Sequence, residues 1–232
     1  MRTMTKTHDH GTKERLIEEA ERLFAENGFS AVSLRDITSA AGANVASVKY
    51  YFGSKAELVS AVEKRLILPV NAERLSRLDR LEAEGRADDV RELLRAFMEP
   101  MLGKVQGNEQ SQMLFARFMA RFFIERAENL KGEVRQECQK VGRRYIAAFA
   151  KIVPWLSPGE ILWRLDFSFG AFANSLLHRT YLTEVTAGQV DLEMDDMFAT
   201  VLDYCECGFL AKKSVVFQGQ ETISMDSHSG DR

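Results

Sequence analysis

The chain has 232 residues, of which 45% are hydrophobic, enough apolar side chain for a buried core. That length allows one mid-sized domain or a small domain joined to a larger one. The formal charge of −3 at pH 7 is mildly acidic and argues against a protein that coats nucleic acid through bulk charge.

The three cysteines, Cys138, Cys205 and Cys207, make no even framework of disulfides. A reducing, cytoplasmic location is the economical interpretation. No apolar stretch reaches the ~20 residues that cross a bilayer, so we expect a soluble protein with no membrane partner.

The chain begins with a polar segment, residues 1–11, that has no repeating pattern and that we expect to be a flexible arm. Its two histidines lack the further ligands that a zinc site needs, and no metal or cofactor site is expected. The first helix is expected over residues 12–27, because apolar side chains recur on one face at Leu16, Ile17, Ala20, Leu23 and Phe24. Gly28 ends this helix.

Two short helical patterns follow and meet at Gly42. Ser33 is a natural N-cap for the first, and Asp36 can return a hydrogen bond in the manner of a capping box. Gly42 supplies a left-handed backbone conformation, and Asn44 can cap a second helix over residues 45–51. Two short helices joined at a steep angle by a glycine turn predict a helix-turn-helix.

The second of these helices has an outward face suited to the major groove of DNA. Its period turns Val48 inward and leaves outside Val45, Ala46, Ser47, Lys49 and Tyr50. Small side chains allow close approach and contact with thymine methyl groups, Ser47 can reach a base or a phosphate, and Lys49 can donate to guanine or to the DNA backbone. The first 66 residues hold ten Lys and Arg against nine Asp and Glu, so affinity must come from placed residues rather than from bulk charge.

The segment AAGANVASVKYYFGSKAEL resembles the DNA-binding signature of the TetR family of bacterial transcriptional regulators. The preceding segment LFAENGFSAVSLRDI is also similar to the family, and the resemblance covers about residues 12–66. The family commonly has a tyrosine inside the recognition helix where this chain has Lys49, followed by Tyr50 and Tyr51. Which of these three contacts bases and which contacts phosphates stays open.

Lys55 lies in the first turn of the next helix, where a cation opposes the helix dipole and indicates a nearby anion such as a DNA phosphate. A solvated lysine is the alternative, and the resembling family uses its lysine here. The expected DNA-binding residues are therefore Ser33, Arg35, Asn44, Val45, Ala46, Ser47, Lys49, Tyr50, Tyr51 and Lys55. The new helix is expected to reach about residue 83, with a kink or break at Pro69, and in the family it connects the reading head to the core.

The remaining helical patterns lie at about residues 90–103, 111–128, 130–153, 160–183 and 192–210, with no strand-like alternation of useful length. We therefore expect an all-α fold. Its parts are a helix-turn-helix domain over residues 12–53, a connecting helix with an effector-binding and dimerisation domain over 54–211, and a flexible tail over 212–232.

The middle helices are dense in methionine and aromatic residues, which can line an adaptable apolar cavity but also make ordinary cores. Asn174 and His178, four residues apart on an apolar helix, are candidates to orient a ligand. We expect a small apolar or amphipathic effector to bind at Met98, Met101, Phe118, Phe122, Phe149, Trp163, Phe167, Asn174 and His178.

The helix expected over residues 160–183 is apolar almost all round, and the one over 192–210 carries an apolar stripe. A helix that is apolar on several faces must be buried on several faces, which indicates a partner chain as well as the protein's own core. As in the resembling family, we expect a four-helix contact between two copies, formed by Phe169, Phe172, Leu176, Phe198, Val201, Leu202 and Cys205. A purely intramolecular core is the alternative.

These features predict a sequence-specific DNA-binding regulator, whose homodimer places two recognition helices about 34 Å apart on a palindromic operator. The resemblance implies a repressor that a small, largely apolar effector releases. The alternative is a ligand-independent DNA-binding or protein-interaction module with a plain helical core. An enzyme is not expected, because His178 is the sole histidine outside the two tails and no P-loop or nucleophile-elbow pattern occurs.

Overall fold

Helices make up the regular structure of the described part of the chain, and no strand occurs there. The computed structural model describes residues 5–102, 109–126, 130–190 and 192–212. The helices are α1 (Thr5–Asn27), α2 (Leu34–Ala40), α3 (Val45–Tyr51), α4 (Lys55–Ala83), α5 (Val90–Met98), the short 3₁₀ helix η1 (Glu99–Leu102), α6 (Glu109–Glu125), α7 (Gly132–Ile152), α8 (Pro158–Leu177), α9 (Arg179–Val185) and α10 (Met194–Leu210). The expected all-α fold is confirmed.

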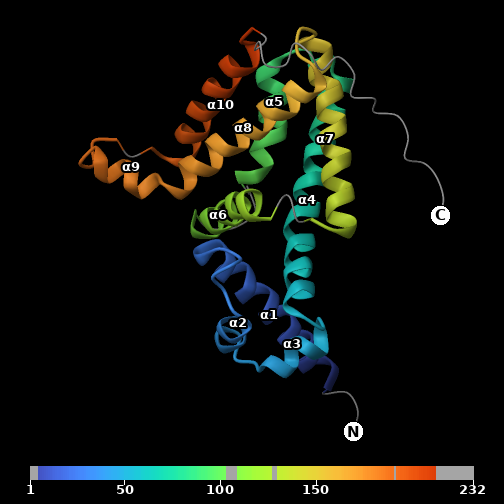
Figure 1. Cartoon of the computed structure of the whole chain (residues 1–232), viewed down its shortest axis with the longest axis vertical. Coiled ribbons are helices and arrows are strands. Elements are labelled where there is room, and N and C mark those ends of the chain that lie inside the picture. The colour runs from blue at the N-terminus through green and yellow to red at the C-terminus, as the bar shows by residue number, and fades with distance from the viewer. Residues whose placement is uncertain (1–4, 103–108, 127–129, 191, 213–232) are drawn as a thin grey trace, which may run out of the picture.

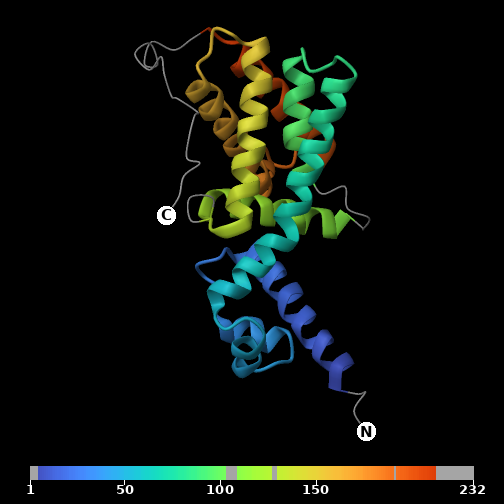
Figure 2. The same cartoon turned by 90° about the vertical axis from the view of Figure 1, so that its right-hand side faces the viewer.

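The helices form two bodies that α4 joins, as Figures 1 and 2 show. α1, α2, α3 and the first turns of α4 make a small head at one end. α5 and α7 pack against the rest of α4, α8 packs against α7, and α10 packs against α5 and α8; together these helices make the larger body. α6 lies crosswise between the two, in contact with α1 on one side and α8 on the other.

Side-chain caps fix the start of both helices of the helix-turn-helix. Ser33 Oγ accepts a hydrogen bond from Asp36 N at 3.2 Å, and Asp36 Oδ2 accepts one from Ser33 N at 2.7 Å, which confirms the predicted capping box. The hydrogen bonds from Ser33 lower the pKa of Asp36 below its usual value. Asn44 Oδ1 accepts a hydrogen bond from Ser47 N at 2.9 Å, and α3 begins at Val45 as predicted.

Three helices differ from the prediction. α1 begins at Thr5, inside the segment expected to be a flexible arm. α4 is one helix through Pro69, so the expected break does not occur, because the turns on both sides of the proline bury apolar side chains against neighbouring helices. The helix expected over residues 160–183 is divided into α8 and α9, because His178 has non-helical backbone angles (φ −109°, ψ 10°).

One apolar core extends through both bodies, and α4 buries three polar side chains in it: Glu63, Asn71 and Arg74. Glu63 Oε1 accepts a hydrogen bond from Arg126 Nε at 2.9 Å. Burial raises the pKa of Glu63, and the Arg126 guanidinium opposes that rise. α4 therefore contributes buried polar groups as well as apolar packing to the centre of the molecule.

Gly28 ends α1 with a left-handed backbone conformation (φ +85°), and a Cβ added there would lie 2.6 Å from Glu125 Oε1. Gly42 also has a positive φ (+59°), but nothing lies within 4 Å of such an atom. Glu125 accepts a hydrogen bond from Phe29 N at 2.8 Å, so a side chain at residue 28 would push away the acceptor of its neighbour.

We predict that Gly42→Ala lowers the free energy of unfolding by about 1 kcal/mol through backbone strain. Gly28→Ala should lower it by about 2–3 kcal/mol, because the bond between Glu125 and Phe29 is lost as well. Urea unfolding followed by circular dichroism measures both variants. Equal losses for the two would contradict the role given to Gly28.

Candidate nucleic-acid interface

α3 presents one side to solvent at the end of the head. Val48 is 1% exposed and packs inward, whereas Tyr50 is 75% and Val45 44% exposed. Ala46 and Lys49 are exposed as well. The chain itself thus leaves uncovered the face of α3 that the sequence predicts for the major groove.

Three of the polar residues predicted to contact DNA also order the head. Asn44 Oδ1 accepts hydrogen bonds from the amide of Ser47 at 2.9 Å and from its hydroxyl at 3.1 Å. Ser33 caps α2, on which Arg35 is exposed. Because these caps form within the chain, the two short helices begin at defined residues before any DNA is bound.

Aromatic rings continue from the end of α3 toward the start of α4. The Tyr50 and Tyr51 rings meet edge to face with centroids 4.9 Å apart, and Tyr51 meets Phe52 in the same way at 6.3 Å. Lys13 of α1 lies over Phe52, 5.9 Å from its centroid. Tyr51 is half-buried while Tyr50 projects into solvent, so Tyr50 has the longer reach of the two.

Lys55 ties the start of α4 to the loop between α1 and α2. Its Nζ donates hydrogen bonds to the carbonyl oxygens of Phe29 (3.2 Å) and Val32 (2.5 Å). The sequence predicts a phosphate beside this amino group, and the structure gives it two backbone carbonyls. Lys55 therefore positions the loop relative to α4, and its contact with DNA stays a prediction.

The same loop connects the head to the larger body. Phe29 N donates a hydrogen bond to Glu125 Oε2 at 2.8 Å. The Phe29 ring stacks on Phe24 with centroids 4.7 Å apart and meets Phe118 of α6 edge to face at 5.5 Å. We call these five residues, Phe24, Phe29, Lys55, Phe118 and Glu125, the Phe29 junction. It links α1, α4 and α6 around a single residue.

The sequence analysis did not identify Glu125 as a residue that links the two bodies. Its partner Phe29 lies 96 residues away in the chain, so no local pattern connects them. No local pattern connects Glu63 with Arg126 either, because these two residues are 63 positions apart. The available signal was an acidic residue within the apolar face of a helix, here Glu63 in α4.

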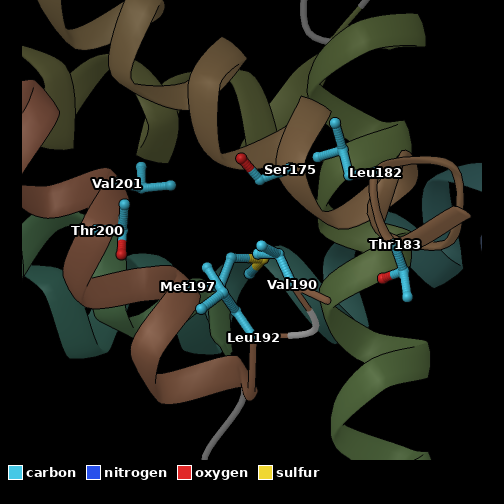
Figure 3. Close-up of a pocket in the computed structure, with 8 residues that line it drawn as sticks. All are labelled: Ser175, Leu182, Thr183, Val190, Leu192, Met197, Thr200 and Val201. Carbon is cyan, nitrogen blue, oxygen red and sulfur yellow. The ribbon is translucent and has the colours of Figure 1, made fainter. Parts of the chain in front are cut away.

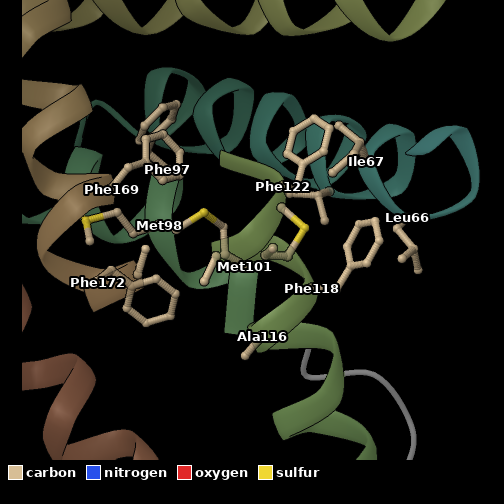
Figure 4. Packing of buried hydrophobic residues seen from close by; sticks show 14 of the residues in the cluster. Leu66, Ile67, Phe97, Met98, Met101, Ala116, Phe118, Phe122, Phe169 and Phe172 are labelled. Atoms are coloured by element: carbon tan, nitrogen blue, oxygen red, sulfur yellow. The ribbon is translucent and has the colours of Figure 1, made fainter. Parts of the chain in front are cut away.

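The residues predicted to bind an effector fall into a buried group and an exposed group. Five fill the core and are no more than 1% exposed, namely Met98, Met101, Phe118, Phe122 and Phe149, the first four of which Figure 4 labels. Trp163 and Phe167 are 52% and 61% exposed, and Asn174 and His178 are also on the surface. Their contact with an effector stays a prediction.

The seven residues predicted for the contact between two copies are buried within a single chain: Phe169, Phe172, Leu176, Phe198, Val201, Leu202 and Cys205. Their contact with a second copy stays a prediction. The outer faces of α8 and α10 carry other large apolar side chains that are between 51% and 72% exposed: Leu162, Trp163, Phe167, Tyr204 and Leu210. We call these five the α8/α10 apolar surface.

Two hollows lie apart from the predicted effector residues. One has a volume of ≈ 120 Å³ and is ringed, as Figure 3 shows, by Ser175, Leu182, Thr183, Val190, Leu192, Met197, Thr200 and Val201 of α8 to α10. The other has a volume of ≈ 520 Å³ and lies between α1, α4, η1 and α6, where its lining includes Glu21, Arg65, Val70, Glu73 and Phe115.

Other kinds of site leave no trace in the described residues. No group of three or more His, Cys, Asp or Glu side chains there is arranged to hold a metal ion. Within the same residues, no helix combines the length and the apolar character that crossing a membrane requires.

Two family models match the chain. Residues 16–62 match the model for bacterial regulatory proteins of the tetR family, and residues 95–208 match the model for the tetracyclin repressor-like C-terminal domain. The first range contains α2 and α3, and the second contains most of the larger body. Together the two matches cover more than half of the 232 residues.

Individual proteins are similar to the chain in part or in fold. A stretch of 48 residues is 46% identical to the probable HTH-type transcriptional regulator YttP of Bacillus subtilis (strain 168), and the match covers 21% of this chain and 23% of that protein. The structure of a transcriptional regulator from Rhodococcus sp. Rha1 has a TM-score of 0.52 and 19% identity over 85% of this chain and 95% of that one. A putative TetR-family regulator from Rhodococcus sp. has a TM-score of 0.48 and 12% identity over 85% and 98%.

The two lysines of the head should respond differently to replacement. Lys55→Met should lower the free energy of unfolding by about 1.5–3 kcal/mol, because two part-buried carbonyls lose a charged donor. Lys49→Met, at an exposed position, should change it by no more than about 0.5 kcal/mol. Chemical unfolding of both variants measures the difference, and a Lys55→Met protein as stable as the wild type would contradict the structural role of Lys55.

Proposed function

This chain belongs to the TetR family of bacterial transcriptional regulators, and we propose that it is a repressor that binds a near-palindromic operator as a homodimer and leaves it when a small, largely apolar effector binds. The proteins of this family are regulators that bind DNA and are not enzymes. The observation that carries the proposal is the uncovered face of α3, set at the far end of the head from the larger body.

The chemistry of that face suits reading of base edges. Ala46 and Val45 are small enough to let α3 approach the floor of the major groove and to contact thymine methyl groups. Lys49 donates to guanine or to phosphate, and Tyr50 reaches beyond it toward the DNA backbone. Arg35 on α2 is placed to hold a phosphate at the side. These contacts are few, so one head alone gives modest affinity.

A homodimer supplies the missing affinity. Two heads related by a two-fold axis place their recognition helices in successive major grooves about 34 Å apart, so each half-site adds its contacts. The α8/α10 apolar surface supports this assembly, because large exposed apolar side chains on adjacent helices are typical of protein contacts. It lies on the same two helices as the seven residues that the sequence indicated for the interface.

Release by an effector requires a path from the larger body to the heads. α4 runs from one body into the other, and the Phe29 junction fixes α6 against the loop of the head. An effector that binds better to a conformation with shifted α6 or α4 would change the spacing of the two heads and lower operator affinity. A ligand with equal affinity for both conformations would change nothing.

The proposal predicts a palindromic binding site. Selection of DNA from a random pool with the purified protein should enrich a sequence with two matched half-sites whose centres are about 10 base pairs, or a multiple of one turn, apart. The same selection with Lys49→Ala should give weaker enrichment or relaxed preference at one position of each half-site, at a cost of about 1–3 kcal/mol per lost base contact. No enrichment of any sequence at moderate salt would overturn the assignment.

The dimer contact can be tested by placing a charge on the α8/α10 apolar surface. Phe167→Glu should convert the dimer to monomer, because a carboxylate in an apolar contact is left unpaired. Ile124→Glu, on α6 and similarly exposed at 64% against 61%, should leave the dimer intact and is the matched control. Analytical ultracentrifugation measures both. A dimer that survives Phe167→Glu, or a control that dissociates to the same extent, places the contact elsewhere.

A further inference from the structure

Arg74 is a buried cation in the middle of α4, where it is 3% exposed. Its Nε donates a hydrogen bond to the carbonyl oxygen of Phe97 at 2.8 Å, and its Nη1 donates one to Asn71 Oδ1 at 3.1 Å. Its Nη2 is buried and has no hydrogen-bond partner. A guanidinium carries five N–H donors, two of them on Nη2, so this edge of the group is unsatisfied.

No carboxylate pairs with Arg74 among the residues that the structure describes. The nearby carboxylates of Glu73 and Glu99 form ion pairs with Arg77, on the next turn of α4, instead. Burial lowers the pKa of Arg74 to about 10, which leaves the group charged at neutral pH. Buried charges are ordinarily paired, because an unpaired charge loses its hydration without compensation. Arg74 is therefore a buried cation with an unsatisfied edge and no carboxylate partner among the described residues.

Aromatic rings surround the guanidinium. Its Cζ lies 4.6 Å from the ring centroid of Phe97, 5.1 Å from that of Phe169 and 6.0 Å from that of Phe123. Such rings attract a cation through their faces. They offer no acceptor in the guanidinium plane, where the N–H groups of Nη2 point and where a carboxylate oxygen accepts.

Two flexible side chains lie beside two of these rings. Met98 and Met101 lie beside Phe97 and Phe169 in the core, as Figure 4 shows, and both are fully enclosed. Methionine is unbranched and flexible, so it changes shape to fit an apolar body at little cost. A ligand whose apolar part displaces these methionines would keep the surroundings of Arg74 dry, which strengthens the bond to its anionic part.

A hollow lies beside the same part of α4. Phe123 is half-buried and stacks on Phe169 with centroids 3.8 Å apart, so one of the three rings around Arg74 is partly exposed to solvent. The hollow of ≈ 520 Å³ is lined by Glu73 and Arg77, which precede and follow Arg74 on the helix, while Arg74 itself is not in its lining.

We propose that Arg74 anchors the effector and that the effector is a small organic monoanion, a carboxylate with an apolar body. The carboxylate completes the unsatisfied edge of the guanidinium, and the apolar body takes the place of the methionines. The inference rests on the proposed function in one respect, namely that a ligand bound here changes operator affinity. Binding at Arg74 itself is independent of DNA.

A ligand bound at Arg74 could also affect the Phe29 junction through α6. Phe123 of α6 is two residues before Glu125, which holds Phe29 N. A ligand that moves the Phe123 ring therefore acts on the turn of α6 that fixes the head. An anion bound at Arg74 would therefore contact α4 directly and act on α6 through Phe123.

Isothermal titration calorimetry with octanoate and benzoate, and with octanamide and benzamide as neutral counterparts, tests the proposal on the full chain. At least one carboxylate should bind, and at least tenfold more tightly than its amide. Arg74→Met, which keeps the length of the side chain without its charge, should weaken carboxylate binding at least tenfold. Arg80→Met, which removes an exposed charge from the same helix, should not. Circular dichroism and operator binding show that each variant is folded, and Arg74→Lys, with intermediate affinity expected, serves if Arg74→Met fails to fold.

The possible outcomes distinguish binding of the anion at Arg74 from release of the operator by that anion. Absence of binding by all four probes, equal binding of acid and amide, or unchanged binding to Arg74→Met overturns the inference. If a neutral apolar compound releases the operator while the acids do not bind, the proposed function stands and the anionic class is wrong. If the acids bind through Arg74 but operator affinity measured by fluorescence anisotropy stays constant, the site stands and release by this ligand is wrong.

Discussion

The head keeps its place on the larger body because three groups from distant parts of the chain converge on Phe29. Its amide donates to Glu125, its carbonyl accepts from Lys55, and its ring lies between Phe24 and Phe118. Gly28 makes this convergence possible, since a side chain there would occupy the position of the Glu125 carboxylate. The orientation of the head, and of α3 within it, relative to the larger body therefore depends on these contacts.

Local features of the fold were readable from the sequence. Ser33 and Asn44 begin α2 and α3 as predicted, because capping depends on residues within one turn of each other. The inward turn of Val48 followed from the helical period alone. The all-α class, too, followed from repeated apolar spacing and from the absence of alternation.

The sequence does not show which neighbour covers an apolar face of a helix. The pattern of α8 indicates burial on several sides, but it does not say which side meets the chain's own core and which stays outside. Phe169 was predicted for a partner and lies inside, whereas Phe167 was predicted for an internal site and lies outside. Charged residues posed the same problem, because the partners of Lys55 and the lack of a carboxylate beside Arg74 are set by residues more than twenty positions away.

Bulk DNA should attract a head with this balance of charge only weakly. The first 66 residues contain ten Lys and Arg and nine Asp and Glu, and both Arg22 and Arg65 form ion pairs with glutamates of the chain. Since nonspecific affinity grows with the number of phosphates that a protein neutralises, few copies would be held along the chromosome at random. The concentration of unbound regulator would then follow the number of molecules made, and a small cellular supply would suffice to keep a specific site occupied.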